Sequence, residues 1–290
     1  MTLLLKKEII MKITVLIENT TRSELLCEHG LSVLIENKGK KYLLDAGTTD
    51  KLLDNARNMN LDLSDVDMCV LSHGHYDHSG GFYTYLQTNN MVNIYAMEKF
   101  DGEYLSSNGG MHEIGVPKDI IKEFGHRFIK VSEVTKIDEG VYLVPHATEG
   151  LEKIGERTGL FKKVDGEILP DDFAHEMSLV IDNGDGLMIF NSCSHGGFCN
   201  IIREVKAYFG DRIINAFIGG LHMKGMKDGE EYCTFSQEQI DEIAVTMEKE
   251  KVKKIFTGHC TGEVGFEKVR LACGDDRVEK LYTGKVIYED

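Results

Sequence analysis

The chain has 290 residues, of which 42% are hydrophobic and 28% are charged. This apolar content is enough for a sizeable core, so a disordered chain is excluded. Its net charge of −15 excludes attraction of nucleic acid or an anionic membrane by the overall field. Seven scattered cysteines do not resemble the disulfide framework of a small secreted domain, so reduced thiols and a cytoplasmic location are expected.

The first ten residues are expected to be an extension ahead of the core. Their charges follow the apolar residues, unlike the order in a signal peptide, and no apolar run approaches the ~20 residues that cross a bilayer. Residues 11–290 are expected to form one domain. Its first strand is predicted at Met11–Glu18, which is rich in β-branched and apolar residues.

A second strand is predicted in the latter half of Glu28–Glu36, and a turn at 37–40 leads into a third strand at Lys41–Leu44. Asp45 follows directly. It either orients a neighbouring ligand histidine through a hydrogen bond or caps a helix predicted at Lys51–Met59. His29 lies before the second strand, where a role in a pocket and a position at a strand edge are both open.

The densest cluster of metal-type side chains follows a predicted strand at Val66–Leu71. His73, His75, Asp77 and His78 lie within six positions. Neutral imidazole suits zinc, iron, nickel or copper, and a carboxylate adds a harder ligand. Four such groups in one tight loop cannot easily face one ion, so they are expected to divide between two ions a few ångströms apart.

This His-x-His-x-Asp-His motif after a hydrophobic strand resembles the signature of the metallo-β-lactamase superfamily. The resemblance implies an α/β (α+β) fold, an αββα sandwich of two packed mixed β-sheets flanked by helices. It also implies that His73 and His75 bind one metal, and that Asp77 and His78 bind the other. An Asp at the position of Asp45 in chain order favours its role behind a ligand histidine.

Residues 97–167 are expected to be an insertion or lid over the metal face. A short helix precedes it near Tyr83–Leu86, a strand is predicted at Val92–Ala96, and a helix is predicted within it at Lys118–Phe124. Strand-like segments follow at 127–131 and 140–144, and 150–167 is expected to be a mobile segment over the site. His112 and His126 are interpreted as surface or lid residues.

The second half repeats the pattern of a strand that ends in a histidine loop. His195 follows a hairpin of strands at 177–181 and 187–190, and a helix is expected from Asn200 to Phe209. His222 follows a strand at 212–218, and His259 follows one at 253–256. Ser236 is expected to cap a helix between these strands, and a helix from Glu263 and one strand near 280–288 close the chain.

We assign His73, His75 and His195 to one metal, and Asp77, His78 and His259 to the other. His175 is the alternative to His195. His146, which follows a strand, is a further but less favoured ligand. The expected ions are two divalent metals, zinc first, with manganese or iron as alternatives.

The catalytic role is given to Asp77, His222 and Asp45. His222 is expected to act as a general acid or to bind a substrate anion, against the alternative of a packed strand-end histidine. By the resemblance, Cys193 or His195 stands where typical hydrolases of the family carry a metal-bridging Asp. For Cys193, a bridging thiolate and a buried thiol behind the ligands both remain open. The usual Gly-His-Thr motif is replaced by Ala174-His175-Glu176.

Four motifs extend the resemblance to one branch of the superfamily, the dihydropterin–ribofuranosylaminobenzene-phosphate synthases and their relatives. They are Glu-His-Gly-Leu-Ser at 28–32, Cys-Ser-His-Gly-Gly at 193–197, Gly-Gly-Leu-His at 219–222 and Thr-Gly-His-Cys-Thr-Gly at 257–262.

The sequence therefore predicts a metal-dependent hydrolase of a small, anionic phosphoester, thioester or lactone, using a hydroxide bridging two ions. A transferase displacing pyrophosphate from a pterin is the alternative, and a metal-bound sensor or di-iron redox protein is the third. The expected partner is a small anionic molecule, without nucleic acid or membrane, and a homodimer is possible.

Overall fold

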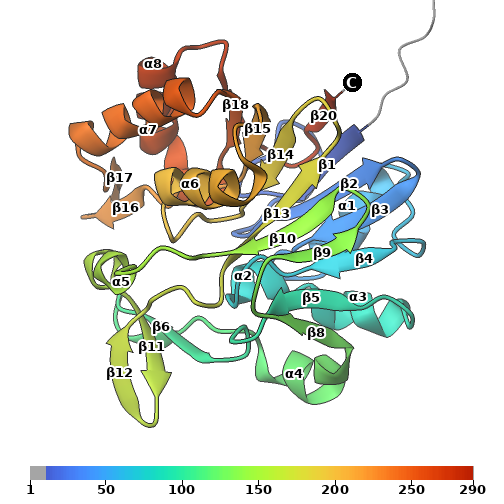
Figure 1. Ribbon diagram of the computed structural model, residues 1–290. Helices are drawn as coiled ribbons and strands as arrows, with labels where there is room; N and C mark the ends of the chain where they lie inside the picture. Colours follow the sequence, from blue (N-terminus) through green and yellow to red (C-terminus); the bar gives the residue numbers. More distant parts are fainter. Residues whose placement is uncertain (1–10, 290) are drawn as a thin grey trace, which may run out of the picture.

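The computed structural model describes residues 11–289, which form two seven-stranded sheets packed face to face, with helices on both outer surfaces (Figure 1). The predicted αββα sandwich is confirmed. The expected extension at residues 1–10 lies outside the described residues. No helix within 11–289 has both the length and the apolar character to span a membrane.

The first sheet has the strand order β20-β1-β2-β3-β4-β5-β8. Its strands are β1 (Met11–Ile17), β2 (Ser32–Asn37), β3 (Lys40–Leu44), β4 (Met68–Val70), β5 (Ile94–Met97), β8 (Phe128–Val131) and β20 (Val286–Glu289). β1, β2 and β3 run antiparallel, whereas β3, β4, β5 and β8 run parallel. Helices α1 (Lys51–Asn58), α3 (Phe82–Thr88) and α4 (Lys118–Phe124) cover its outer face.

The second sheet repeats this mixture in the order β19-β18-β15-β14-β13-β10-β9. Its strands are β9 (Thr135–Asp138), β10 (Val141–Pro145), β13 (Met177–Asp182), β14 (Leu187–Phe190), β15 (Ile214–Ile218), β18 (Val252–Thr257) and β19 (Val278–Lys280). β14, β15, β18 and β19 run parallel. Helices α6 (Phe198–Phe209), α7 (Gln237–Lys249) and α8 (Gly262–Cys273) cover the outer face. Ser236 caps α7 in a reciprocal pair with Gln239, as predicted.

The central core lies between the two sheets. It includes Ile13, Val33 and Leu44 from the first sheet, and Leu179 and Phe190 from the second, all at most 1% exposed. The central strands pack against this core on one face and against helices on the other. Strands buried on both faces read as continuous apolar runs, which is why their positions were predictable.

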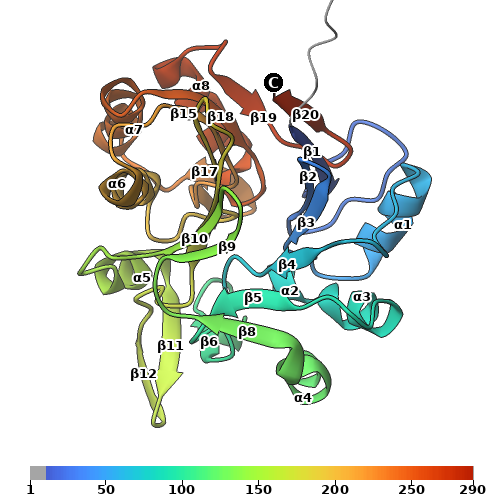
Figure 2. The same cartoon turned by 45° about the vertical axis from the view of Figure 1, so that its right-hand side comes forward.

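A separate small sheet lies beside the sandwich, next to helix α2 (Tyr76–Ser79) (Figure 2). It consists of β6 (Glu103–Ser106), β7 (His112–Glu113), β11 (Leu160–Val164) and β12 (Glu167–Pro170), and α5 (Glu152–Thr158) precedes β11. This corrects the expected insertion at 97–167, because β8, β9 and β10 within those bounds belong to the two main sheets. Within 150–167 the chain forms helix α5 and strand β11, the first strand of a hairpin with β12, and the mobility expected of this segment stays a prediction.

Two further details differ from the sequence analysis. The single strand expected near 280–288 is two strands, because β19 joins β18 in the second sheet and β20 then crosses to pair with β1 in the first. A hairpin that was not predicted, β16 (Lys224–Lys227) and β17 (Glu230–Cys233), packs against α8. The chain turn at 281–285 thus joins the two sheets near the histidine-bearing edge.

Candidate metal centre

The loops that follow parallel strands meet at one edge of the sandwich. Carboxyl ends of parallel strands share an edge, where open α/β sheets carry their ligand sites. Asp45 follows β3, the motif from His73 to His78 follows β4, His195 follows β14, and His259 follows β18. Although 181 residues separate His78 from His259, their Nε2 atoms are 3.2 Å apart.

Hydrogen bonds fix the ring orientation of three of these histidines. His78 Nδ1 donates to Asp45 Oδ2 at 2.8 Å. Ser72 Oγ donates its proton to the same carboxylate, so it accepts from His73 Nδ1 at 2.8 Å. His259 Nδ1 donates to the side-chain amide oxygen Oδ1 of Asn19 at 2.9 Å. Because Nδ1 of each ring is occupied by its hydrogen bond, Nε2 is the nitrogen left to bind a metal.

One group of ligand atoms contains Asp77, His78 and His259. Asp77 Oδ2 lies 3.5 Å from His78 Nε2 and 3.4 Å from His259 Nε2, and the two ring nitrogens are 3.2 Å apart. Nitrogen and oxygen ligands about 2.1 Å from one tetrahedral ion are separated by ~3.4 Å. The three side chains therefore have the spacing of ligands to a single cation.

A second group contains His73, His75 and His195. Their ligand atoms lie within 4.8 Å of one another, and His73 Nε2 is 3.3 Å from His195 Nε2. All three rings are at most 4% exposed, and His75 Nε2 and His195 Nδ1 are buried without a hydrogen-bond partner. The 3.3 Å spacing and the two ring nitrogens without a partner fit three ligands that surround one cation.

The protonation equilibria fit the same interpretation. Burial lowers the pKa of His73 and His195 well below the ordinary value, and that of His75 to about 3, so these rings stay neutral at pH 7. Burial opposes the charged form of His78 as well, yet Asp77 and Asp45 raise its pKa to about 10. A position that attracts a proton this strongly also attracts a metal cation in its place.

His175 does not face either group with a free nitrogen. It is fully buried, its Nδ1 accepts the Gly74 N–H at 2.9 Å, and its Nε2 donates to Asp171 Oδ2 at 2.9 Å. Both ring nitrogens are therefore occupied. The structure favours His195 over His175 as the ligand, and gives His175 the task of holding the metal loop at Gly74.

His146 is also occupied on both sides. Its Nδ1 contacts Glu204 at 2.9 Å and its Nε2 contacts Glu176 at 2.5 Å. Burial would lower its pKa, but these two glutamates raise the pKa of His146 to about 10. It is thus a buried cation between two carboxylates, and the metal role considered for it is incompatible with these contacts.

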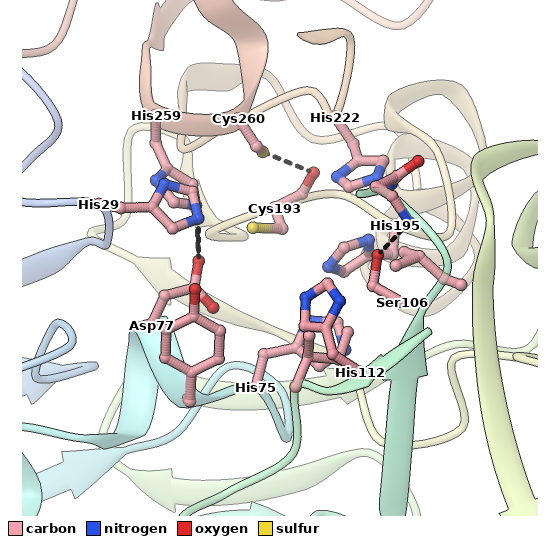
Figure 3. A pocket seen from close by; sticks show the side chains of 14 residues that line it. His29, His75, Asp77, Ser106, His112, Cys193, His195, His222, His259 and Cys260 are labelled. Atoms are coloured by element: carbon pink, nitrogen blue, oxygen red, sulfur yellow. Dashed lines mark hydrogen bonds and ion pairs between the residues drawn. The ribbon is translucent and has the colours of Figure 1, made fainter. Parts of the chain in front are cut away.

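A cavity of about 200 Å³ opens over the histidines (Figure 3). His222 lines it, with the ring centroid 4.3 Å from that of His195 and Nδ1 without a partner. His29 also lines it, contacts Asp77 Oδ2 at 3.2 Å and stacks on His259. The strand-edge alternative for His29 is therefore wrong in this structure, although more than half of its side chain is exposed.

The small sheet forms the opposite wall of this cavity. Ser106 at the end of β6, Ile114 after β7 and Leu160 of β11 line it, together with His112. His112 is exposed, as expected of a lid residue, whereas His126 is absent from the lining. Among the described residues that line the cavity there is no lysine or arginine.

Two cysteines lie between the metal groups and the cavity. Cys193 Sγ is 3.3 Å from His78 Nε2, and Cys260 Sγ points at the Cys193 carbonyl oxygen at 3.6 Å (Figure 3). Burial raises the pKa of Cys193 well above the ordinary value in the absence of a metal. Both roles considered for Cys193, a metal-bound thiolate and a buried thiol, fit this position.

Several residues at the site adopt strained backbone conformations. Asp45, Ser194, His222 and His259 have φ angles of 56°, 55°, 48° and 50°, in the left-handed region that non-glycine residues seldom adopt. Such residues cost of order 1–3 kcal/mol each and cluster at functional sites. The strain therefore marks the same edge as the histidines do.

Three residues that bind these loops were missed in the sequence analysis. Glu18 accepts the backbone N–H of His259, Glu176 accepts that of His195, and Asn19 accepts from the His259 ring. Glu18 ends an otherwise apolar strand, and Glu176 directly precedes one. In the sequence, the only sign that either residue is buried and has a role is a carboxylate directly beside an apolar strand.

The fold and the edge cluster together define a class: sandwich proteins whose histidine and carboxylate side chains can hold divalent metal. The model of the metallo-beta-lactamase superfamily matches residues 26–175, slightly more than half of the chain. The chain therefore belongs to the metallo-β-lactamase superfamily, as its motif indicated.

Relatives narrow the comparison. The chain is 28% identical over 274 residues to the 7,8-dihydropterin-6-methyl-4-(β-D-ribofuranosyl)-aminobenzene-5'-phosphate synthase of Methanocaldococcus jannaschii, covering 90% of each chain. It is 30% identical over 222 residues to an uncharacterised protein of that organism, covering 74% of this chain and 81% of the other. Among solved structures, Tm1679, a metal-dependent hydrolase of the β-lactamase superfamily, matches with a TM-score of 0.78 and 25% identity, covering 96% of this chain and 98% of the other.

Proposed function

We propose that this protein is a metal-dependent enzyme that holds two divalent ions, one at His73, His75 and His195, and one at Asp77, His78 and His259. The observation that carries the proposal is the pair of short Nε2–Nε2 separations between buried rings, 3.3 Å and 3.2 Å, each close to the spacing of two ligands on one ion. Divalent ions in such a site act as Lewis acids and make water nucleophilic near neutral pH.

Hydrolysis of a small anionic ester is the reaction that we favour. The cavity of about 200 Å³ is smaller than the ~300–1,000 Å³ of typical ligand pockets, so it fits the reacting group rather than a whole large substrate. The rest of the substrate would extend along the wall of Ser106, Ile114 and Leu160. His222, whose partly exposed ring lines the cavity, is placed to donate a proton to a leaving group.

A transferase reaction is the second candidate, and the relative that is named a synthase favours it. In that reaction an amine or carbon nucleophile of the second substrate displaces pyrophosphate from a dihydropterin. The site residues would then stabilise the charge that develops on the leaving group, and water would have to be excluded. The same side chains serve both reactions, so the two differ in the molecule that accepts the transferred group, which is water in the hydrolase and the second substrate in the transferase.

One assay separates the two. Protein loaded with zinc or manganese is incubated with phosphodiester, thioester and lactone substrates, and separately with dihydropterin pyrophosphate plus ribofuranosylaminobenzene phosphate. Release of alcohol, thiol or acid without an added acceptor supports the hydrolase, and pyrophosphate release that requires the acceptor supports the transferase. Wild-type protein that binds fewer than two ions per chain would reject the proposed centre itself. The His195→Ala variant is the control for contaminating hydrolases.

A further inference from the structure

The three loops that carry the proposed metal ligands share one construction. In each loop a backbone N–H, at or next to a ligand histidine, donates a hydrogen bond to a fully buried carboxylate. Asp45 takes the N–H of Ser72, Glu176 that of His195, and Glu18 that of His259. None of these carboxylates is more than 1% exposed.

Glu176 holds the His195 loop with both of its oxygens. Oε1 accepts the N–H of His195 at 2.9 Å, and Oε2 accepts the N–H of Gly196 at 3.0 Å. His146 contacts Oε2 from the other side and links it to Glu204 of α6, the helix that begins just after this loop. The glutamate therefore ties the loop both to β13, which it precedes, and to α6.

Glu18 does the same for the His259 loop from the opposite sheet. Its Oε1 accepts the His259 N–H at 2.5 Å, and its Oε2 accepts the Thr20 N–H at 2.6 Å and the Thr20 hydroxyl at 2.7 Å. His259 is one of the residues in the left-handed conformation, with φ of 50°. The carboxylate therefore anchors the backbone of His259, while Asn19 orients its ring.

We propose that Glu18 and Glu176 are positioning residues, each dedicated to one metal: Glu18 to the ion at Asp77, His78 and His259, and Glu176 to the ion at His73, His75 and His195. This inference rests on the two-metal centre of the proposed function. In both glutamates each oxygen accepts from an N–H, so glutamine cannot replace them, because its amide NH₂ would face one of those donors.

The test compares Glu18→Gln and Glu176→Gln with the wild type, each saturated with zinc and then competed with a chelator. Occupancy of each position is measured by anomalous diffraction, and total zinc by atomic emission. Loss of a hydrogen-bonding partner behind a ligand typically costs 10–100-fold in metal affinity. We expect that loss at the His195 ion alone in Glu176→Gln, and at the His259 ion alone in Glu18→Gln. Glu36→Gln, which breaks a surface ion pair with Lys12, is the matched control and should keep both ions.

Equal loss of both ions in each variant, or full retention of both, would overturn the inference, since a merely structural role does not select one ion. If a glutamine variant does not fold, Glu18→Asp and Glu176→Asp retain the charge and shift the oxygens, and the same selectivity is expected with smaller loss. A wild type without two ions would instead reject the proposed centre, so the two failures are distinguishable.

Discussion

Asp45 offers the most direct test of how the site is held. Its carboxylate is fully buried and accepts three hydrogen bonds, from the Ser72 N–H, the Ser72 hydroxyl and His78 Nδ1. Asparagine tolerates the left-handed φ of 56° at this position, so Asp45→Asn changes the hydrogen bonds without adding backbone strain. The effect of the substitution can then be attributed to the lost acceptor and charge.

The magnitude follows from those three contacts. The better amide orientation keeps its oxygen towards His78 and the Ser72 hydroxyl, and leaves the buried Ser72 N–H facing an NH₂ group. That unsatisfied donor costs ~1–3 kcal/mol, and two hydrogen bonds that lose the assistance of a charge weaken by ~1 kcal/mol each. We therefore expect the metal-free variant to lose about 4 kcal/mol of unfolding free energy. Its affinity for the ion at His78 should be about 10–100-fold lower.

Urea denaturation of the metal-free proteins measures the first quantity, and zinc competition with a chelator measures the second. At saturating zinc, turnover should fall more than metal content, because the ring of His78 is less firmly oriented. Asp65→Asn, which breaks an exposed ion pair with Lys41, is the control and should stay within ~0.5 kcal/mol of the wild type. An Asp45→Asn protein with the stability, zinc affinity and turnover of the wild type would refute the reasoning.

Three further outcomes are expected. His73→Ala and His78→Ala should each lower bound metal, counted by atomic emission, to half or less, and a variant that keeps two tightly bound ions would defeat the assignment. Metal binding near pH 7 should release protons, because Asp77 and Asp45 hold a proton on His78 until a cation replaces it; calorimetry in buffers of different ionisation enthalpy detects the release. His146 has its pKa raised to about 10 from 6.5, so its stabilising effect is complete below pH 6.5 and is lost as pH rises through 10. The free energy of unfolding, measured with urea, should therefore fall more between pH 6.5 and 10 in the wild type than in His146→Gln.

The parts of the fold that were predictable are those fixed by local signals. The core strands read as continuous apolar runs, and Ser236 formed the expected cap of α7; its reciprocal pair with Gln239 is a finding of the structure. The hairpin of β11 and β12 was missed although Asp165-Gly166 carries its signal, two residues with φ of 51° and 87° between alternating strands. The segment is rich in charged residues, which favoured a mobile segment over a hairpin in the sequence analysis.

The site divides in the same way. The histidines were found because each stands in a glycine-flanked loop after a strand. Glu18 and Glu176 were not, because a buried carboxylate is meaningful only through its partner, and Glu18 meets His259 across 241 positions of sequence. The divided C-terminal strand was missed for a related reason, since only three-dimensional pairing shows that β19 and β20 belong to different sheets.

The lining of the cavity leads to one last prediction. Histidines surround it, and among the described lining residues there is no lysine or arginine to neutralise an anion. The neighbouring carboxylates and the net charge of −15 repel one. An anionic substrate must then be attracted by the ions themselves, so a phosphonate monoester should bind the zinc-loaded protein and fail to bind the metal-free protein. Isothermal titration at low ionic strength measures both. Equal affinity with and without zinc would show that side chains alone recognise the anion, and would contradict the inferred role of the two ions.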